Sequence, residues 1–76
     1  MTISDWMKST NRSAFQLAAI LGLSEMAVRR YAQGSRMPEP EIAQRIVEVT
    51  EGAVSIQDLH DTRLAFLRSS ASHEAA

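Results

Sequence analysis

The sequence predicts an all-α fold of five short helices around one hydrophobic core. Three observations support this prediction. Apolar residues recur with helical spacing, no stretch alternates apolar and polar residues as a strand does, and three glycines fall between the helical segments. With 76 residues the chain has room for one domain, which we place at residues 1–68. Residues 69–76 are mostly small and polar, which predicts a disordered tail.

The first predicted helix begins after Thr2 and runs to about Ser9. Asp5 lies three residues after Thr2, where an acidic residue suits a helix start. Trp6 is the expected core anchor of this helix, and residues 10–12 connect it to the next.

The second predicted helix begins with a capping box formed by Ser13 and Gln16, in which each side chain satisfies a backbone amide at the helix start. It runs to Leu21 and ends because Gly22 tolerates a positive φ. Its expected inward face consists of Leu17, Ala18 and Leu21.

The third predicted helix is capped by Ser24 and runs to about Gln33, where Gly34 ends it. Its inward face follows the same spacing as that of the second helix. That face consists of Ala27, Val28 and Tyr31.

The last two predicted helices cover about residues 40–50 and residues 55–68. Pro40 suits a helix start, and Gly52 separates the two helices. The fourth is expected to bury Ile42, Ala43, Ile46, Val47 and Val49, and the fifth offers Leu59, Leu64, Phe66 and Leu67.

The composition excludes several classes of protein. Without cysteine the chain forms no disulfide and no thiolate metal site. No apolar run approaches the roughly 18 residues that cross a bilayer, and the N-terminal residues lack the pattern of a signal peptide. We therefore expect a cytoplasmic protein.

The sequence offers no enzyme chemistry. His60 and His73 are the two histidines, and neither lies near a nucleophile or a metal-ligand pattern. The three glycines separate helices and form no phosphate-binding loop. We expect no catalytic residues, no metal, no cofactor and no small-molecule ligand.

Residues 13–31 form the most informative stretch: a helix, a tight turn at residues 22–24 and a second helix. Ala18 is small enough to let the second helix pack closely across the first, and Leu23 and Val28 fill the space between them. This is the pattern of a helix-turn-helix unit.

The chain therefore carries a motif that extends over much of its length. The matching residues are Ser13, Leu17-Ala18, Leu21-Gly22-Leu23-Ser24, Val28 and Tyr31, followed by Gly34, Pro38, Ile42-Ala43, Ile46, Thr50, Gly52-Ala53-Val54 and Asp58-Leu59. On these residues the sequence resembles the Cro and lambda-repressor-like helix-turn-helix family, and in particular the short Cro-like (YdaS-type) regulators of prophages and mobile elements. The resemblance covers about residues 12–60.

The resemblance implies that the third helix enters the major groove of double-stranded DNA and that the chain acts at the nucleoid. The base-contacting residues that it implies, taken as the outward positions of that helix, are Arg30, Arg29, Glu25, Met26 and Gln33. Arginine donates two hydrogen bonds to guanine, so Arg30 and then Arg29 are the leading candidates. The implied phosphate contacts are Ser13, Gln16, Ser24 and Arg36.

The fifth helix carries more apolar residues than one core-facing stripe needs. We expect Leu64, Phe66 and Leu67 to form a dimer interface, because helix-turn-helix regulators usually bind palindromic sites as twofold dimers.

The sequence thus predicts a sequence-specific transcriptional regulator, most simply a repressor of its own operon or mobile element, with activation as a second mode. Residues 1–36 carry a net charge of +3 and residues 37–76 one of −4, so a basic half can face an anion. Two alternatives stay open. One is an antitoxin that also represses its operon, and the other is a protein-binding anti-activator, which Glu25 and the overall charge of −1 would permit.

Overall fold

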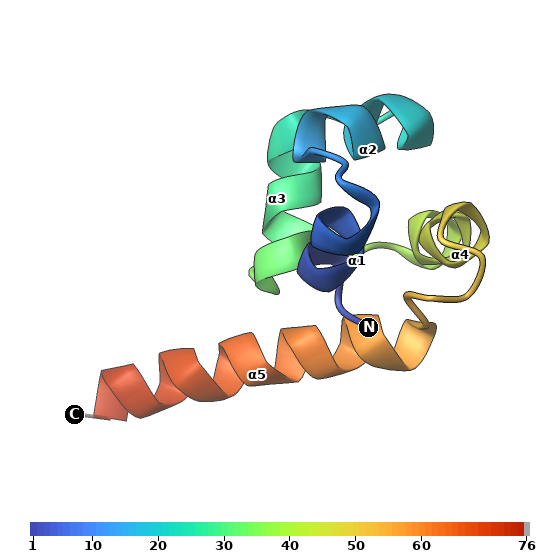
Figure 1. Ribbon diagram of the computed structural model, residues 1–76. Helices are drawn as coiled ribbons and strands as arrows, with labels where there is room; N and C mark the ends of the chain where they lie inside the picture. Colours follow the sequence, from blue (N-terminus) through green and yellow to red (C-terminus); the bar gives the residue numbers. More distant parts are fainter. Residues whose placement is uncertain (76) are drawn as a thin grey trace.

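The computed structural model describes residues 1–75, with side chains described for residues 1–69, and over that range it contains five helices and no strand. The predicted all-α class is therefore confirmed. The helices are α1 (Ile3–Thr10), α2 (Ala14–Leu21), α3 (Glu25–Gln33), α4 (Pro40–Val49) and α5 (Ile56–Ala75). Figure 1 shows α1 to α4 clustered on one side of α5, whose C-terminal half extends beyond the cluster.

The first three helices begin at the caps that the sequence predicts. The Asp5 amide donates to Thr2 Oγ1 over 3.1 Å, and the Ala27 amide donates to Ser24 Oγ over 3.1 Å. The capping box is complete: the Ser13 amide donates to Gln16 Oε1 at 2.8 Å, and the Gln16 amide donates to Ser13 Oγ at 3.1 Å. These short-range hydrogen bonds satisfy amides that have no partner inside the helix.

Three of the helices end on a residue in the left-handed region. Gly22 closes α2 at φ 73° and Gly34 closes α3 at φ 87°, as predicted. Asn11 closes α1 at φ 56°, so this helix extends to Thr10 and ends one residue later than the sequence suggests. Asparagine tolerates this conformation better than most residues, which explains the stop.

The core draws on every helix. Leu17, Val28, Ile46 and Val54 are almost fully buried, and Trp6 is 6% exposed, which confirms its predicted role as an anchor. The other buried apolar residues are Ile3, Ala18, Leu21, Tyr31, Ala43 and Leu59.

The burial expected for α4 is only partly correct. Ala43 and Ile46 are buried, whereas Ile42, Val47 and Val49 are half-buried and pack at the edge. A helix turns by about 100° per residue, so these five positions spread over a wider arc than one packing surface covers.

The end of α5 differs from the prediction. The helix continues to Ala75 and does not stop near Arg68, so the stretch 69–75, predicted as a disordered tail, is helical in its backbone. The small polar residues there suggested a tail, but the stretch contains neither glycine nor proline to end a helix. No helix in residues 1–75 has the length and apolar character needed to cross a membrane.

Candidate nucleic-acid interface

The site is built on α2 and α3, which are joined by residues 22–24. Gly22 takes the left-handed conformation, and the amide of Leu23 donates to the Ala18 carbonyl over 2.9 Å. Ala18 and Leu21 of α2 share one buried cluster with Val28 and Tyr31 of α3. The short connection and the shared core hold the two helices against each other.

The outward face of α3 collects all five residues predicted to contact bases. Their positions fall at helical spacings of one, four, five and eight from the first, which places them on one side of the helix. Each is exposed, and Met26 has 57% of its surface accessible. These residues are Glu25, Met26, Arg29, Arg30 and Gln33.

The two arginines of this face have different surroundings. Arg29 Nη2 lies 3.0 Å from Glu25 Oε1, one helical turn away, and both side chains are exposed. Arg30 forms no ion pair with any other residue in the described part of the chain. Because an exposed pair of this kind contributes only about 0.3–0.5 kcal/mol, a stronger anion can draw Arg29 away from Glu25. Arg30 can bind an anion without first breaking an ion pair.

The residues predicted to contact phosphates are all exposed, but three of them also cap helices. At the start of α2 the side chains of Ser13 and Gln16 each accept a hydrogen bond from the backbone amide of the other residue, and Ser24 caps α3. Arg36 lies exposed in the segment after α3. Capping leaves the side-chain NH₂ of Gln16 and the hydroxyl protons of the serines able to donate.

Two cationic residues that the sequence analysis did not select lie beside this site. Lys8 and Arg12 line a surface groove together with Ser13, Ala14 and Gln16 at the start of α2. No carboxylate lines this groove. The Arg12 guanidinium carbon sits 5.5 Å from the centroid of the Trp6 ring. The position of Lys8 and Arg12 shortly before the capping box is the feature of the sequence that could have indicated them.

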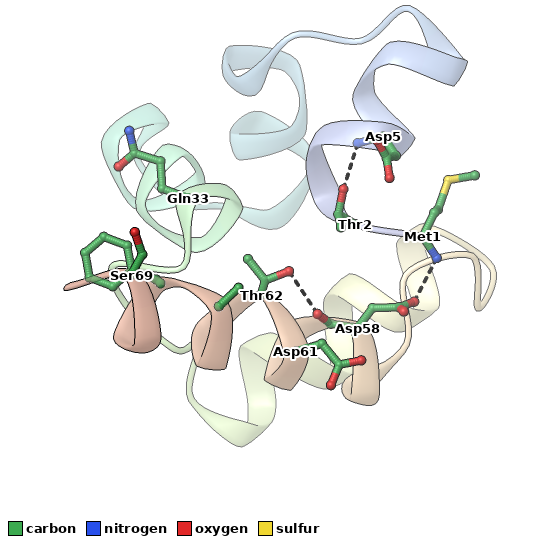
Figure 2. A pocket seen from close by; sticks show the side chains of 10 residues that line it. Met1, Thr2, Asp5, Gln33, Asp58, Asp61, Thr62 and Ser69 are labelled. Carbon is green, nitrogen blue, oxygen red and sulfur yellow. Dashed lines mark hydrogen bonds and ion pairs between the residues drawn. The ribbon is translucent and has the colours of Figure 1, made fainter. Parts of the chain in front are cut away.

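A second groove, on the side facing α5, has the opposite character. Figure 2 shows its side chains, among them Asp5, Asp58 and Asp61, with Gln33 at one end. The N-terminal ammonium of Met1 lies 2.8 Å from Asp58 Oδ2. This hydrogen bond, with one from the Ser55 amide, lowers the pKa of Asp58 from 3.8 to about 2. A groove rich in carboxylates repels phosphate, so among its lining residues only Gln33, on the outward face of α3, belongs to the candidate interface.

The three residues predicted to form a dimer interface do not share one face of α5. Leu64 and Leu67 lie about 60° apart around the helix, whereas Phe66 lies about 100° from Leu67 and farther from Leu64. The Cβ of Phe66 lies next to the end of α3, where a Cβ on Gly34 would be 3.0 Å away from it. Phe66 and Leu67 are exposed, with 36% and 44% of their surfaces accessible, and Leu64 is half-buried. The dimer interface itself stays a prediction, and the contact of Phe66 Cβ with Gly34 adds a neighbour that sequence spacing did not reveal.

The described side chains contain no group of three or more His, Asp or Glu residues arranged to hold a metal ion. His60 is exposed, and the side chain of His73 lies outside the described part of the chain. Comparison of the sequence and the structure with protein-family models, curated proteins and solved structures found no match.

Proposed function

We propose that this chain is a sequence-specific DNA-binding regulator of transcription that inserts α3 into the major groove. The observation that carries the proposal is the exposed face of α3, where Arg30 projects from a short helix without an ion-pair partner in the described residues. Guanine O6 and N7 accept two hydrogen bonds from one guanidinium, a contact that contributes about 1–3 kcal/mol of discrimination.

The surroundings of α3 support the same proposal. Lys8 and Arg12 line a carboxylate-free groove at the start of α2, and Arg36 follows the end of α3. Cations that flank a base-contacting helix in the chain can contact the phosphate backbone beside it. On this basis α2 and α3 act as a helix-turn-helix unit of the Cro-like kind, and occupancy of a promoter site would exclude the polymerase.

A twofold dimer is part of the proposal, because one small domain buries little surface on DNA. The contact residues that we assign to it are the exposed Phe66 and Leu67 and the half-buried Leu64 on α5. Two α3 helices related by a twofold axis would read half-sites about 10 base pairs apart.

The test is selection of bound sequences from random duplex DNA at about 150 mM salt, followed by fluorescence anisotropy on the selected duplex and on a scrambled control. We expect a palindromic sequence bound about a thousandfold more tightly than the control. Absence of enrichment, with only weak salt-sensitive binding, would refute the proposal. The acidic groove containing Asp5 and Asp61 would then favour a protein-binding function with a basic partner.

The roles of the arginines can be separated by substitution. Arg30→Ala should cost about 1–3 kcal/mol on the selected duplex and relax specificity at one base pair. Arg36→Ala should weaken binding to all sequences evenly and reduce the salt slope by about one. Equal losses for both variants on every sequence would show that Arg30 does not contact a base.

A further inference from the structure

The end of α3 is in direct contact with the backbone of α5. Gly34 is buried at φ 87°, and a Cβ placed on it would overlap the Thr62 carbonyl oxygen. The same Cβ would lie 3.0 Å from the Phe66 Cβ. Only glycine allows two segments to approach this closely, so α5 packs directly against the end of α3.

A charged hydrogen bond holds this contact. Arg63 Nη1 of α5 donates to the Gly34 carbonyl over 2.8 Å, across 29 residues of sequence. The Arg63 guanidinium carbon lies 5.8 Å from the centroid of the Phe66 ring, which restrains the side chain. The guanidinium therefore sits at the C-terminal end of α3, where the helix dipole favours a positive charge.

A backbone hydrogen bond links Gly34 to Arg30, the leading candidate for base contact. The Gly34 amide donates to the Arg30 carbonyl over 3.0 Å and to the Tyr31 carbonyl over 3.3 Å. The Ser35 hydroxyl donates to the same Arg30 carbonyl over 3.3 Å. A shift of Gly34 would therefore be transmitted to the last turn of α3, which carries Arg30 and Gln33.

We propose that Arg63 is a positioning residue for sequence recognition: by holding Gly34 against α5, it sets the orientation in which Arg30 meets a base. The proposal rests on the proposed DNA-binding function. A bidentate contact tolerates displacements of only about 0.5 Å, whereas phosphate contacts from long cationic side chains tolerate more. Loss of Arg63 should therefore reduce specificity and leave the general attraction to DNA in place.

The experiment compares three variants of the full chain with the wild type by anisotropy, on the selected and on the scrambled duplex. Arg63→Met keeps the aliphatic stem and removes the donor, and Arg63→Lys keeps a donor of the same charge. Arg68→Met is the matched control, because Arg68 is exposed on the same helix and its loss changes the net charge equally. Active protein is counted by stoichiometric titration, so a folding defect is not read as weaker affinity.

The discrimination ratio is the dissociation constant for the scrambled duplex divided by that for the selected duplex. We expect Arg63→Met to lower this ratio about tenfold, through weaker binding to the selected duplex alone. Arg63→Lys should recover most of the ratio, and Arg68→Met should match the wild type. Wild-type behaviour of Arg63→Met, or equal weakening on both duplexes, would overturn the proposal.

Hydrogen exchange in the absence of DNA supplies a second readout. Arg63→Met should speed exchange of the Gly34 amide, which donates to the end of α3, and leave the amides of α2 unchanged, whereas Arg68→Met should change neither. If the wild type itself fails to discriminate between duplexes, the proposed function and the role of Arg63 in recognition both fail. The exchange data would still decide whether Arg63 holds the end of α3.

Discussion

Helices α2 and α3 both end at a glycine, but the two glycines have different surroundings. Gly22 and Gly34 are both left-handed, at φ 73° and 87°. A Cβ on Gly22 would meet no atom within 4 Å, whereas one on Gly34 would overlap α5. The turn between α2 and α3 is therefore a local structure that needs only the backbone freedom of glycine. The end of α3 is a tertiary contact, and it joins the candidate recognition helix to the last helix of the chain.

The sharpest test of this difference is a pair of glycine-to-alanine substitutions. Gly22→Ala should cost about 1–2 kcal/mol, which is the cost of a left-handed alanine. Gly34→Ala carries the same backbone cost and adds about 1–3 kcal/mol of overpacking against α5, so it should be the most destabilising of these variants. The measurement is the free energy of unfolding from urea titration monitored by circular dichroism.

Equal destabilisation by the two substitutions would contradict the comparison, because it would mean that α5 can move aside at no cost. A Gly34→Ala chain that stays folded should also lose discrimination between duplexes, as expected for Arg63→Met. Gly22→Ala should bind in proportion to its folded fraction.

A smaller effect compares the side-chain hydrogen bonds beside the two glycines. Ser24→Ala removes the cap of α3 and should cost about 1 kcal/mol. Ser35→Ala removes only a 3.3 Å bond to the Arg30 carbonyl and should cost a few tenths. Urea titrations of both variants test this order. A larger loss for Ser35→Ala would show that the Ser35 hydroxyl stabilises the end of α3 more than the Ser24 cap stabilises its start.

Another small effect concerns the N-terminal end of α5, which is held by the pair between the Met1 ammonium and Asp58. The folded state lowers the pKa of Asp58 from 3.8 to about 2, so the carboxylate stabilises the fold above about pH 4. That contribution disappears as the pH falls from 4 to 2. Both partners are partly exposed, so it amounts to about 0.5 kcal/mol.

The free energies of unfolding at pH 6 and pH 2.5, measured for the wild type and for Asp58→Asn, isolate this contribution. Other carboxyl groups titrate in both chains, so the relevant quantity is the difference between their losses. We expect the wild type to lose more stability than Asp58→Asn. Identical losses would show that the pair with Met1 does not hold α5, and would leave the Gly34 contact as its main attachment.

The parts of the fold that short-range chemistry determines could be predicted from the sequence. The capping box of Ser13 and Gln16, the cap at Ser24 and the glycine stops follow from neighbours within four residues. The same applies to the outward face of α3, because its residues follow from the inward spacing of Val28 and Tyr31.

The parts that depend on distant contacts could not be predicted. The Cβ of Phe66 lies against Gly34, 32 positions earlier in the chain, and no spacing within α5 indicates that contact. Arg63 attracted no attention in the sequence, because its partner is a backbone carbonyl. The extension of α5 to Ala75 was missed because small polar residues are compatible with either a tail or a helix.

The position of Trp6 has a practical consequence. It is the chain's single tryptophan, and the Arg12 guanidinium faces its ring. Arg12 also lines the carboxylate-free groove that contains Lys8. Indole emission responds to a nearby charge, and an anion in that groove would compete with the ring for this guanidinium. The unlabelled chain therefore contains its own optical probe, with which a titration can follow occupancy of the groove without a dye.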